Sequence, residues 1–187
     1  MHSDRTALWG AVRELAKEPF VVLDTETTGL TAPEAVSIAV VDAAGRPLIH
    51  RLIRPGKAIE PGASRITGID AATVADAPTF ASIEPELTAI LRNRTVAIYN
   101  ADYDTQVLRN TYARYGLSEP PYRPWCVMKW FARVFGEWNP SRNDFKWQSL
   151  PAAAAYFRIS QESAHDALDD CMTTWRILQA ALRKPEA

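Results

Sequence analysis

The apolar and polar residues at the start of the chain follow two different periods. Over residues 5–17, apolar positions recur at helical spacing between charged ones, which predicts an opening helix within residues 1–18. Three apolar runs with strand character come next, at Phe20–Leu23, Ala35–Val41 and Leu48–Ile53. Short connections rich in turn residues favour antiparallel pairing, so we expect these three strands to form an antiparallel group.

The remainder of the chain combines one further strand with several helices. An irregular stretch with one helical turn extends to Pro78, a helical pattern covers residues 80–92, and Thr95–Tyr99 reads as a fourth strand. A strand–helix–strand crossing of this length lays its strands parallel, so the fourth strand should run parallel to a neighbour. Helices are predicted at Asp102–Tyr115, Trp125–Phe135, Trp147–Phe157 and Ser163–Leu182, with a loop at Gly136–Asn143. The fold class is therefore α/β.

Length and composition indicate an ordinary globular chain. Its 187 residues, 47% hydrophobic and 23% charged, suit a single domain spanning 1–187, with a frayed tail at 184–187. Cys126 and Cys171 form neither a disulfide framework nor a C-x-x-C pair, and with three scattered histidines they argue against a zinc site. We find no signal peptide, and no apolar run approaches the roughly 20 residues that span a bilayer. These features predict a soluble cytoplasmic protein that does not contact membranes.

Two acids follow the first predicted strand, in the run DTETTGL that begins at Asp24. Positions i and i+2 of a strand point to the same face, so Asp24 and Glu26 would aim at one spot. Two carboxylates that close repel each other, and one pKa rises unless a cation lies between them. The acid pair alone fits a solvated strand end equally well.

A second group of acids lies where the fourth strand passes into a helix. Asp102 and Asp104 follow Asn100 at this junction, which is where open α/β sheets bind ligands. An acid in a first helical turn also stabilises the helix dipole, and Asp102 could serve as an N-cap. These residues therefore allow both a site and a structural role.

A third group opens the last predicted helix. At about 100° per residue, Asp166 and Asp170 lie clear of the helix's apolar stripe, and Asp169 falls between. Spacing alone does not choose between Asp166 and Asp170 as a site residue. A histidine at a helix start is usually a capping or surface residue, and His165 stands out because acids surround it.

Together the three segments resemble the DEDD (DEDDh, DnaQ-like) 3′–5′ exonuclease superfamily, in the branch that includes DNA polymerase III epsilon, exonuclease X and RNase T. Its motifs stand here, in matching order over residues 24–170, as DTETTGL, YNADYDTQVL and HDALDD. Two weaker similarities begin at Ile66 (ITGI) and Lys146 (KWQSL). Tyr99 and Thr67 stand where the family commonly has histidine, near the expected nucleotide pocket.

The resemblance implies an RNase H-like mixed sheet, with three antiparallel strands followed by parallel strands, flanked by helices. It also implies which residues form the site. The implied metal ligands are Asp24, Glu26, Asp104 and Asp170, with His165 as general base. The implied substrate-binding residues are Thr27, Thr28, Gly29, Leu30, Asn100 and Tyr103, with Leu30 as a wedge between the last bases.

The chemistry implied is hydrolysis of the last 3′ phosphodiester linkage, releasing nucleoside 5′-monophosphates. Carboxylates are suitable ligands for two Mg²⁺ or Mn²⁺ ions, which clamp the attacking and leaving oxygens about 3.5–4 Å apart. A neutral histidine, with a reference pKa near 6.5, can accept the proton of the attacking water.

Aromatic and basic residues offer a separate indication of nucleic-acid binding. The formal net charge is −1, yet residues 92–146 carry nine Lys/Arg against five Asp/Glu. Twelve of the 18 aromatic residues lie between Tyr99 and Trp147, and interleaved rings and cations suit single strands. We expect Trp130 and Phe131 in the core. The rings and cations expected at the surface are those of Tyr122, Trp138, Arg142 and Lys146.

The predicted function is a metal-dependent 3′–5′ exonuclease acting on single-stranded ends, DNA in preference to RNA. Its partners would be nucleic-acid 3′ ends and, in proofreading or DNA repair, a DNA polymerase. One alternative is an RNase T-like or oligoribonuclease-like exoribonuclease. The sequence contains no pattern that indicates recognition or exclusion of the sugar 2′-hydroxyl, so it does not distinguish RNA from DNA as substrate. An alternative of another class is a non-catalytic nucleic-acid-binding or polymerase accessory module.

Overall fold

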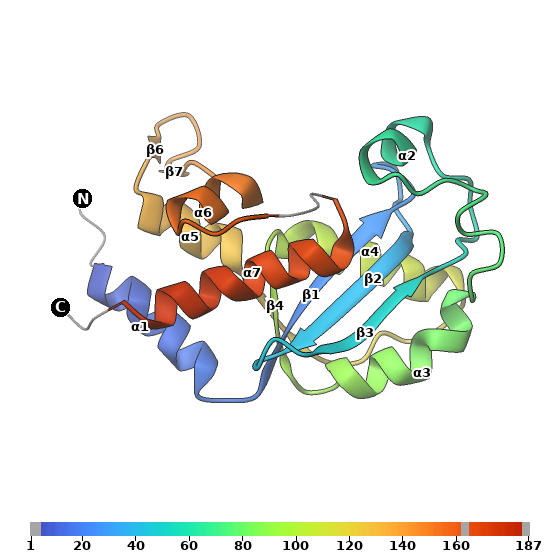
Figure 1. Cartoon of the computed structure of the whole chain (residues 1–187), viewed down its shortest axis with the longest axis horizontal. Coiled ribbons are helices and arrows are strands. Elements are labelled where there is room, and N and C mark those ends of the chain that lie inside the picture. The colour runs from blue at the N-terminus through green and yellow to red at the C-terminus, as the bar shows by residue number, and fades with distance from the viewer. Residues whose placement is uncertain (1–4, 162–164, 185–187) are drawn as a thin grey trace.

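The computed structural model describes residues 5–161 and 165–184, and it is built around one five-stranded mixed sheet (Figure 1). The strand order is β3-β2-β1-β4-β5. The first three strands pair antiparallel, whereas β4 and β5 run parallel to β1. The predicted mixed sheet is thus confirmed. The strands are β1 (Phe20–Thr27), β2 (Ala35–Asp42), β3 (Pro47–Leu52), β4 (Thr95–Ile98) and β5 (Arg123–Cys126).

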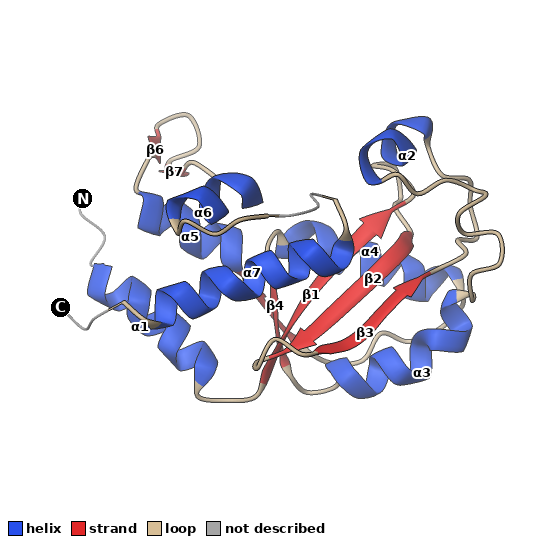
Figure 2. Cartoon of the chain, in the orientation of Figure 1, coloured by secondary structure: helices blue, strands red, loops and turns tan. Residues whose placement is uncertain are grey.

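Helices cover both faces of this sheet. One face packs against α1, α5, α6 and α7, and the other against α3 and α4. Helix α7 packs against β1 and β2, on the side of the sheet that is turned toward the viewer in Figure 2. Of the described helices, none combines the length and the apolar character needed to cross a membrane. The helices are α1 (Arg5–Ala16), α2 (Pro61–Thr67), α3 (Phe80–Leu91), α4 (Ala101–Arg114), α5 (Val127–Phe135), α6 (Leu150–Tyr156) and α7 (Ala167–Leu182).

The apolar side chains of β1 alternate between the two faces of the sheet. Phe20 and Val22 pack with the α7 face, whereas Val21 and Leu23 pack with the α3 and α4 face. The strand continues to Thr27, beyond its predicted end at Leu23, and keeps this alternation. Because the side-chain period of a strand is two, its acids at positions 24 and 26 belong to the face that α7 covers.

Some predicted boundaries were wrong, each for a local reason. The residues before Val127 form β5 instead of the start of a helix, because Trp125 and Cys126 pair with β4. Pro124 is tolerated there because β5 is an edge strand. Helix α6 begins at Leu150 because the side chain of Ser149 accepts a hydrogen bond from an amide of the first turn.

Other segments differ in extent from the prediction. Helix α2 is longer than the single turn expected there. The predicted loop at Gly136–Asn143 contains a strand of a small hairpin, β6 (Trp138–Asn139) with β7 (Asp144–Phe145). Helix α7 is described from Ala167; the residues at 163–164, where its start was predicted, lie outside the described part of the chain. Residues 185–187 of the predicted frayed tail lie outside it as well.

Candidate active site

The candidate site lies where β1 and β4 end side by side. These two strands are parallel, so their carboxyl ends meet at one edge of the sheet. Asp24 and Glu26 stand near the end of β1, and α4 starts directly after β4 with Asp104 in its first turn. Thr25 joins the two elements: its backbone N–H (3.2 Å) and its hydroxyl (2.7 Å) both donate to Asp104 Oδ1.

The start of α7 adds the remaining acid and the histidine. Asp166 is the N-cap of this helix, and its carboxylate accepts hydrogen bonds from two amides of the first turn. Asp170 is the acid whose Oδ1 accepts a hydrogen bond from Gln161 Nε2. Ligand atoms of Glu26, His165 and Asp170 lie within 4.8 Å of one another. His165 adopts φ 65°, a left-handed conformation that histidine tolerates better than most residues.

The acids shift one another's pKa values upward. Burial is the largest cause for each, and neighbouring carboxylates add to it. The pKa of Glu26 rises to about 8, through burial and the charges of Asp170 and Asp104. The pKa of Asp104 rises to about 7 despite the two hydrogen bonds from Thr25. Burial also raises the pKa of Asp170, and that of Asp24 is raised well above its ordinary value.

The donor set fits divalent cations. Among the described residues, no lysine or arginine forms an ion pair with Asp24, Glu26, Asp104 or Asp170. Their oxygens are the hard ligands that Mg²⁺ and Mn²⁺ prefer. A cation among them would relieve the repulsion that raises the pKa values. Glu26, His165 and Asp170 form the group that could hold a cation, and Asp24 and Asp104 lie close enough for their charges to act on it.

A cavity of about 500 Å³ opens beside the acids. Two of its apolar side chains are unusually exposed: Leu30, after β1, is 83% exposed, and Ile66, on α2, is 60% exposed. Exposed apolar side chains at a cavity are typical of a binding surface. The lining residues are Thr25, Glu26, Thr27, Gly29, Leu30, Glu60, Gly62, Ala63, Ile66, Thr67, Asn100, Tyr103 and His165.

Two side chains lie against the cavity wall at Gly29. The Tyr103 hydroxyl donates to Gly29 O (3.1 Å) and hydrogen-bonds Thr27 Oγ1 (2.9 Å). A Cβ at position 29 would lie 2.1–2.4 Å from the carboxylate of Glu60, and its φ of 150° already disfavours side chains. The backbone conformation therefore favours glycine at this position, and a side chain here would also displace the carboxylate of Glu60.

Five of the six predicted substrate-binding residues line the cavity, and Thr28 does not. Thr28 is fully buried, and its hydroxyl accepts a hydrogen bond from Glu34 N. Tyr99, which stands where the resembled family has histidine, is also turned inward, and its hydroxyl donates to Gln148 O. Thr67, the other departure from that family, lies on the cavity wall.

The sequence interpretation missed Thr25, Gln161 and Glu60. Thr25 lies between two acids, and strand alternation could have pointed to a role on the opposite face. The contacts of Gln161 and Glu60 depend on how distant segments meet, so no local pattern indicates them.

The predicted division of the aromatic residues is confirmed for most positions. Trp130 and Phe131 are buried, whereas Trp138 is exposed. Arg142 lies 5.1 Å from the ring centre of Trp147, and Lys146 pairs with Glu137. Tyr122 is half-buried and donates to Glu119. None of the four predicted surface residues lines the cavity beside the acids.

Comparisons with known proteins show a family match and several relatives of this chain. The RNase_T family model, described as an exonuclease, matches residues 21–178. An uncharacterized exonuclease, CP81 of Escherichia phage 186, is 37% identical over 169 residues, which cover 86% of each chain. DNA polymerase III subunit epsilon of Escherichia coli is 27% identical over 163 residues, or 80% of this chain and 65% of epsilon.

Solved structures agree in fold. Exonuclease X in complex with 5′ overhanging duplex DNA superposes with a TM-score of 0.65 at 29% identity, covering 87% of this chain and 90% of that one. Exonuclease I of E. coli in complex with a dT13 oligonucleotide has a TM-score of 0.71 at 19% identity, covering 88% of this chain and 40% of that one.

Proposed function

The chain belongs to the RNase_T exonuclease family, within the DEDD superfamily, and on that premise we propose that it removes nucleotides from 3′ ends of single-stranded DNA. As a family member it is a nuclease. The observation that carries the proposal is the meeting of Glu26, His165 and Asp170, with Asp24 and Asp104 close enough for their charges to act on the group, beside a cavity with exposed apolar walls.

Asp24, Glu26, Asp104 and Asp170 would hold two divalent cations. When bound, such cations stabilise the attacking and leaving oxygens of a phosphodiester during an in-line displacement. Thr25 and Gln161 would orient two of the ligands through their hydrogen bonds. His165, at the exposed side of the cluster, would accept the proton of the attacking water at a ring nitrogen.

The cavity would receive the terminal nucleotide. Leu30 and Ile66 offer apolar surface to the bases, and Tyr103 holds the loop backbone at Gly29. Exonuclease X was solved in complex with 5′ overhanging duplex DNA, and epsilon is a subunit of DNA polymerase III, so both similarities support DNA as the substrate. Hydrolysis from the 3′ end is part of the proposal, and the labelled-substrate assay below tests it. The similarity to epsilon also makes association with a DNA polymerase, in proofreading or repair, a role to test.

The test is a time course on single-stranded DNA and RNA of the same sequence, labelled at the 5′ end, with Mg²⁺, Mn²⁺ or EDTA. We expect a metal-dependent ladder that shortens from the 3′ end, faster on DNA. A faster ladder on RNA would favour the exoribonuclease alternative. An intact substrate with every metal would favour a non-catalytic module or a subunit that needs its polymerase.

Three variants test the assignment of the acids, two of them in the cluster and one outside it as a control. Asp104→Asn should abolish cleavage, because it removes a charge from the cluster. Asp102→Asn, two residues away, should leave cleavage unchanged, because Asp102 is exposed and pairs with Lys129 on α5. Asp170→Asn should also abolish cleavage with the fold intact. Near-normal activity of either cluster variant would contradict the site assignment.

A further inference from the structure

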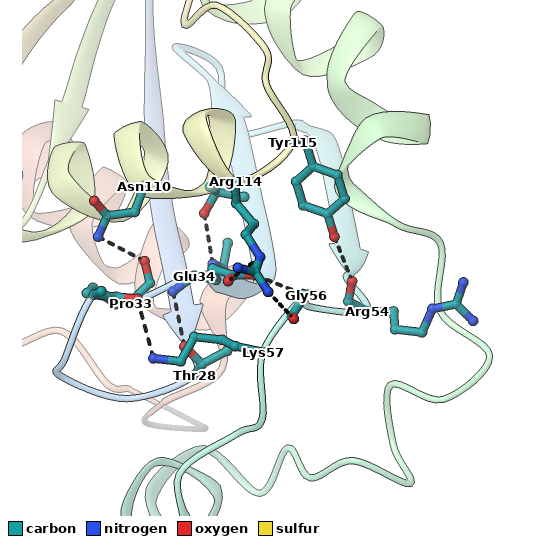
Figure 3. A network of polar contacts seen from close by, with 12 residues as sticks. Thr28, Pro33, Glu34, Arg54, Gly56, Lys57, Asn110, Arg114 and Tyr115 are labelled. Atoms are coloured by element: carbon teal, nitrogen blue, oxygen red, sulfur yellow. Dashed lines mark hydrogen bonds and ion pairs between the residues drawn. The ribbon is translucent and has the colours of Figure 1, made fainter.

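One carboxylate outside the acid cluster is buried and fully engaged. Glu34, just before β2, is 4% exposed. Its Oε2 accepts a hydrogen bond from Gly56 N (2.8 Å), and its Oε1 lies 3.4 Å from Arg114 Nε (Figure 3). Its backbone exchanges hydrogen bonds with Thr28, through Thr28 N to Glu34 O (2.9 Å) and Glu34 N to Thr28 Oγ1 (3.1 Å). Glu34 therefore joins three segments that are distant in sequence.

The first of these segments, the loop at residues 28–34, is tied to α4. Asn110 Nδ2 donates to Pro33 O (3.1 Å), and Thr111 Oγ1 accepts from Ala35 N (3.0 Å). Figure 3 shows Asn110 and Arg114 reaching from successive turns of this helix toward the loop. The loop carries Gly29 and Leu30 of the cavity wall.

The second segment, residues 54–60, is tied to the same helix. Arg114 also donates to Gly56 O, and the hydroxyl of Tyr115 donates to Arg54 O (3.1 Å). This segment leads to Glu60, whose N–H donates to Thr28 O (2.7 Å), and then into α2. Helix α2 itself has no buried residue, so its place at the cavity depends on these anchors and on Ile59 and Ile69, which flank it and pack with Val36 of β2.

Helix α4 carries the cluster acid at its other end. Asp104 and Arg114 are ten residues apart, or about 15 Å along the helix axis. One rigid element thus positions both an acid of the cluster and the two loops that wall the cavity.

We propose that Glu34 is a positioning residue of the exonuclease: with Arg114 it sets the place of both cavity walls relative to the acids, and so the affinity for the nucleic-acid end. This inference rests on the proposed function. Removing the carboxylate leaves Gly56 N–H without its acceptor and Arg114 without its ion pair, with Gly56 O as its remaining contact at this junction, so the loop at Gly56 and the α2 wall shift. Chemistry at the acids, which Glu34 does not touch, continues once substrate is bound.

Three variants separate positioning from simple stability. Glu34→Ala removes both contacts, whereas Glu34→Gln keeps an oxygen that can accept from Gly56 N. Gly56→Ala perturbs the same junction without touching the acid, because its Cβ would lie 2.7 Å from Arg114 Nε. Gly10→Ala is the matched control, since a Cβ there meets nothing within 4 Å.

The experiment measures kcat and KM on 5′-labelled single-stranded DNA, at a temperature where circular dichroism finds each variant folded. We expect KM to rise about tenfold in Glu34→Ala and in Gly56→Ala, less in Glu34→Gln, with kcat within about threefold. In an Asp170→Asn background, fluorescence anisotropy should give a matching loss of DNA affinity. Gly10→Ala should behave as the unsubstituted chain.

A merely structural role predicts a different result. If folded Glu34→Ala keeps its KM and DNA affinity, or loses only kcat, the positioning role is wrong. If the unsubstituted chain cleaves no nucleic acid, the proposed function fails instead. The anisotropy comparison then still decides whether Glu34 positions a binding surface.

Discussion

Raising the pH should destabilise the metal-free protein, because its buried acids must ionise beside one another. The pKa of Glu26 is about 8 in the folded chain against an ordinary 4.5. Between these values the unfolded chain releases the proton and the folded chain keeps it. The folded state therefore binds more protons, and stability falls as pH rises, from about 4.5 until the loss is complete above about 8.

The size of this loss follows from the shifts. One pKa unit corresponds to about 1.4 kcal/mol, so the rise at Glu26 alone has an upper bound of about 4–5 kcal/mol. Asp104, with a pKa of about 7 against 3.8, adds a second contribution over a lower pH range. Water that enters as the acids ionise lowers the cost, so we expect a total loss of about 2–4 kcal/mol between pH 5 and pH 8.

The assay is urea unfolding at pH 5, 6, 7 and 8 in EDTA, repeated with Mg²⁺ or Mn²⁺. A cation that binds only the ionised cluster should offset most of the loss, and more so at high pH. Glu26→Gln should be more stable than the unsubstituted chain at pH 8 in EDTA and should show a shallower slope. Glu14→Gln, on the exposed face of α1, should keep the original slope.

Two results would refute this reasoning. The first is a flat or rising stability profile in EDTA from pH 5 to pH 8. The second is a Glu26→Gln variant with the same slope as the unsubstituted chain. Either would mean that the carboxylates are not crowded in solution as they are in the structure.

Three further substitutions test individual contacts at the site. Thr25→Val removes the hydroxyl that donates to Asp104 and should lower metal affinity and kcat about 10–100-fold, read from a Mg²⁺ titration of activity. Gln161→Leu removes the hydrogen-bond donor to Asp170, so the pKa of Asp170 should rise further. The acidic limb of the pH–activity profile should then move to higher pH. A profile whose acidic limb stays in place would contradict the role of this contact. Leu30→Ala should raise KM for single-stranded DNA about tenfold with urea stability unchanged, because the side chain is 83% exposed; an unchanged KM would remove Leu30 from the binding surface.

The local sequence pattern was sufficient to predict most strands of the sheet and the shared face of the first acid pair. Alternation in β1 already places Asp24 and Glu26 on one face, because the side-chain period of a strand is a property of a few consecutive residues. The parallel placement of β4 likewise follows from the length of the connection before it. The strand β5 was missed because four residues, one of them Pro124, carry too little periodicity to distinguish a strand from a helix start.

Tertiary structure shows contacts that spacing leaves open. Spacing alone did not choose between Asp166 and Asp170, and the family resemblance implied Asp170. The folded chain shows Asp166 engaged as the helix cap and Asp170 near Glu26. Glu34 is a second example, because it contacts Gly56 and Arg114, which lie 22 and 80 residues later in the sequence. Such contacts depend on the order of the strands and on the packing of α4 against them, and periodicity within one element carries no information about either.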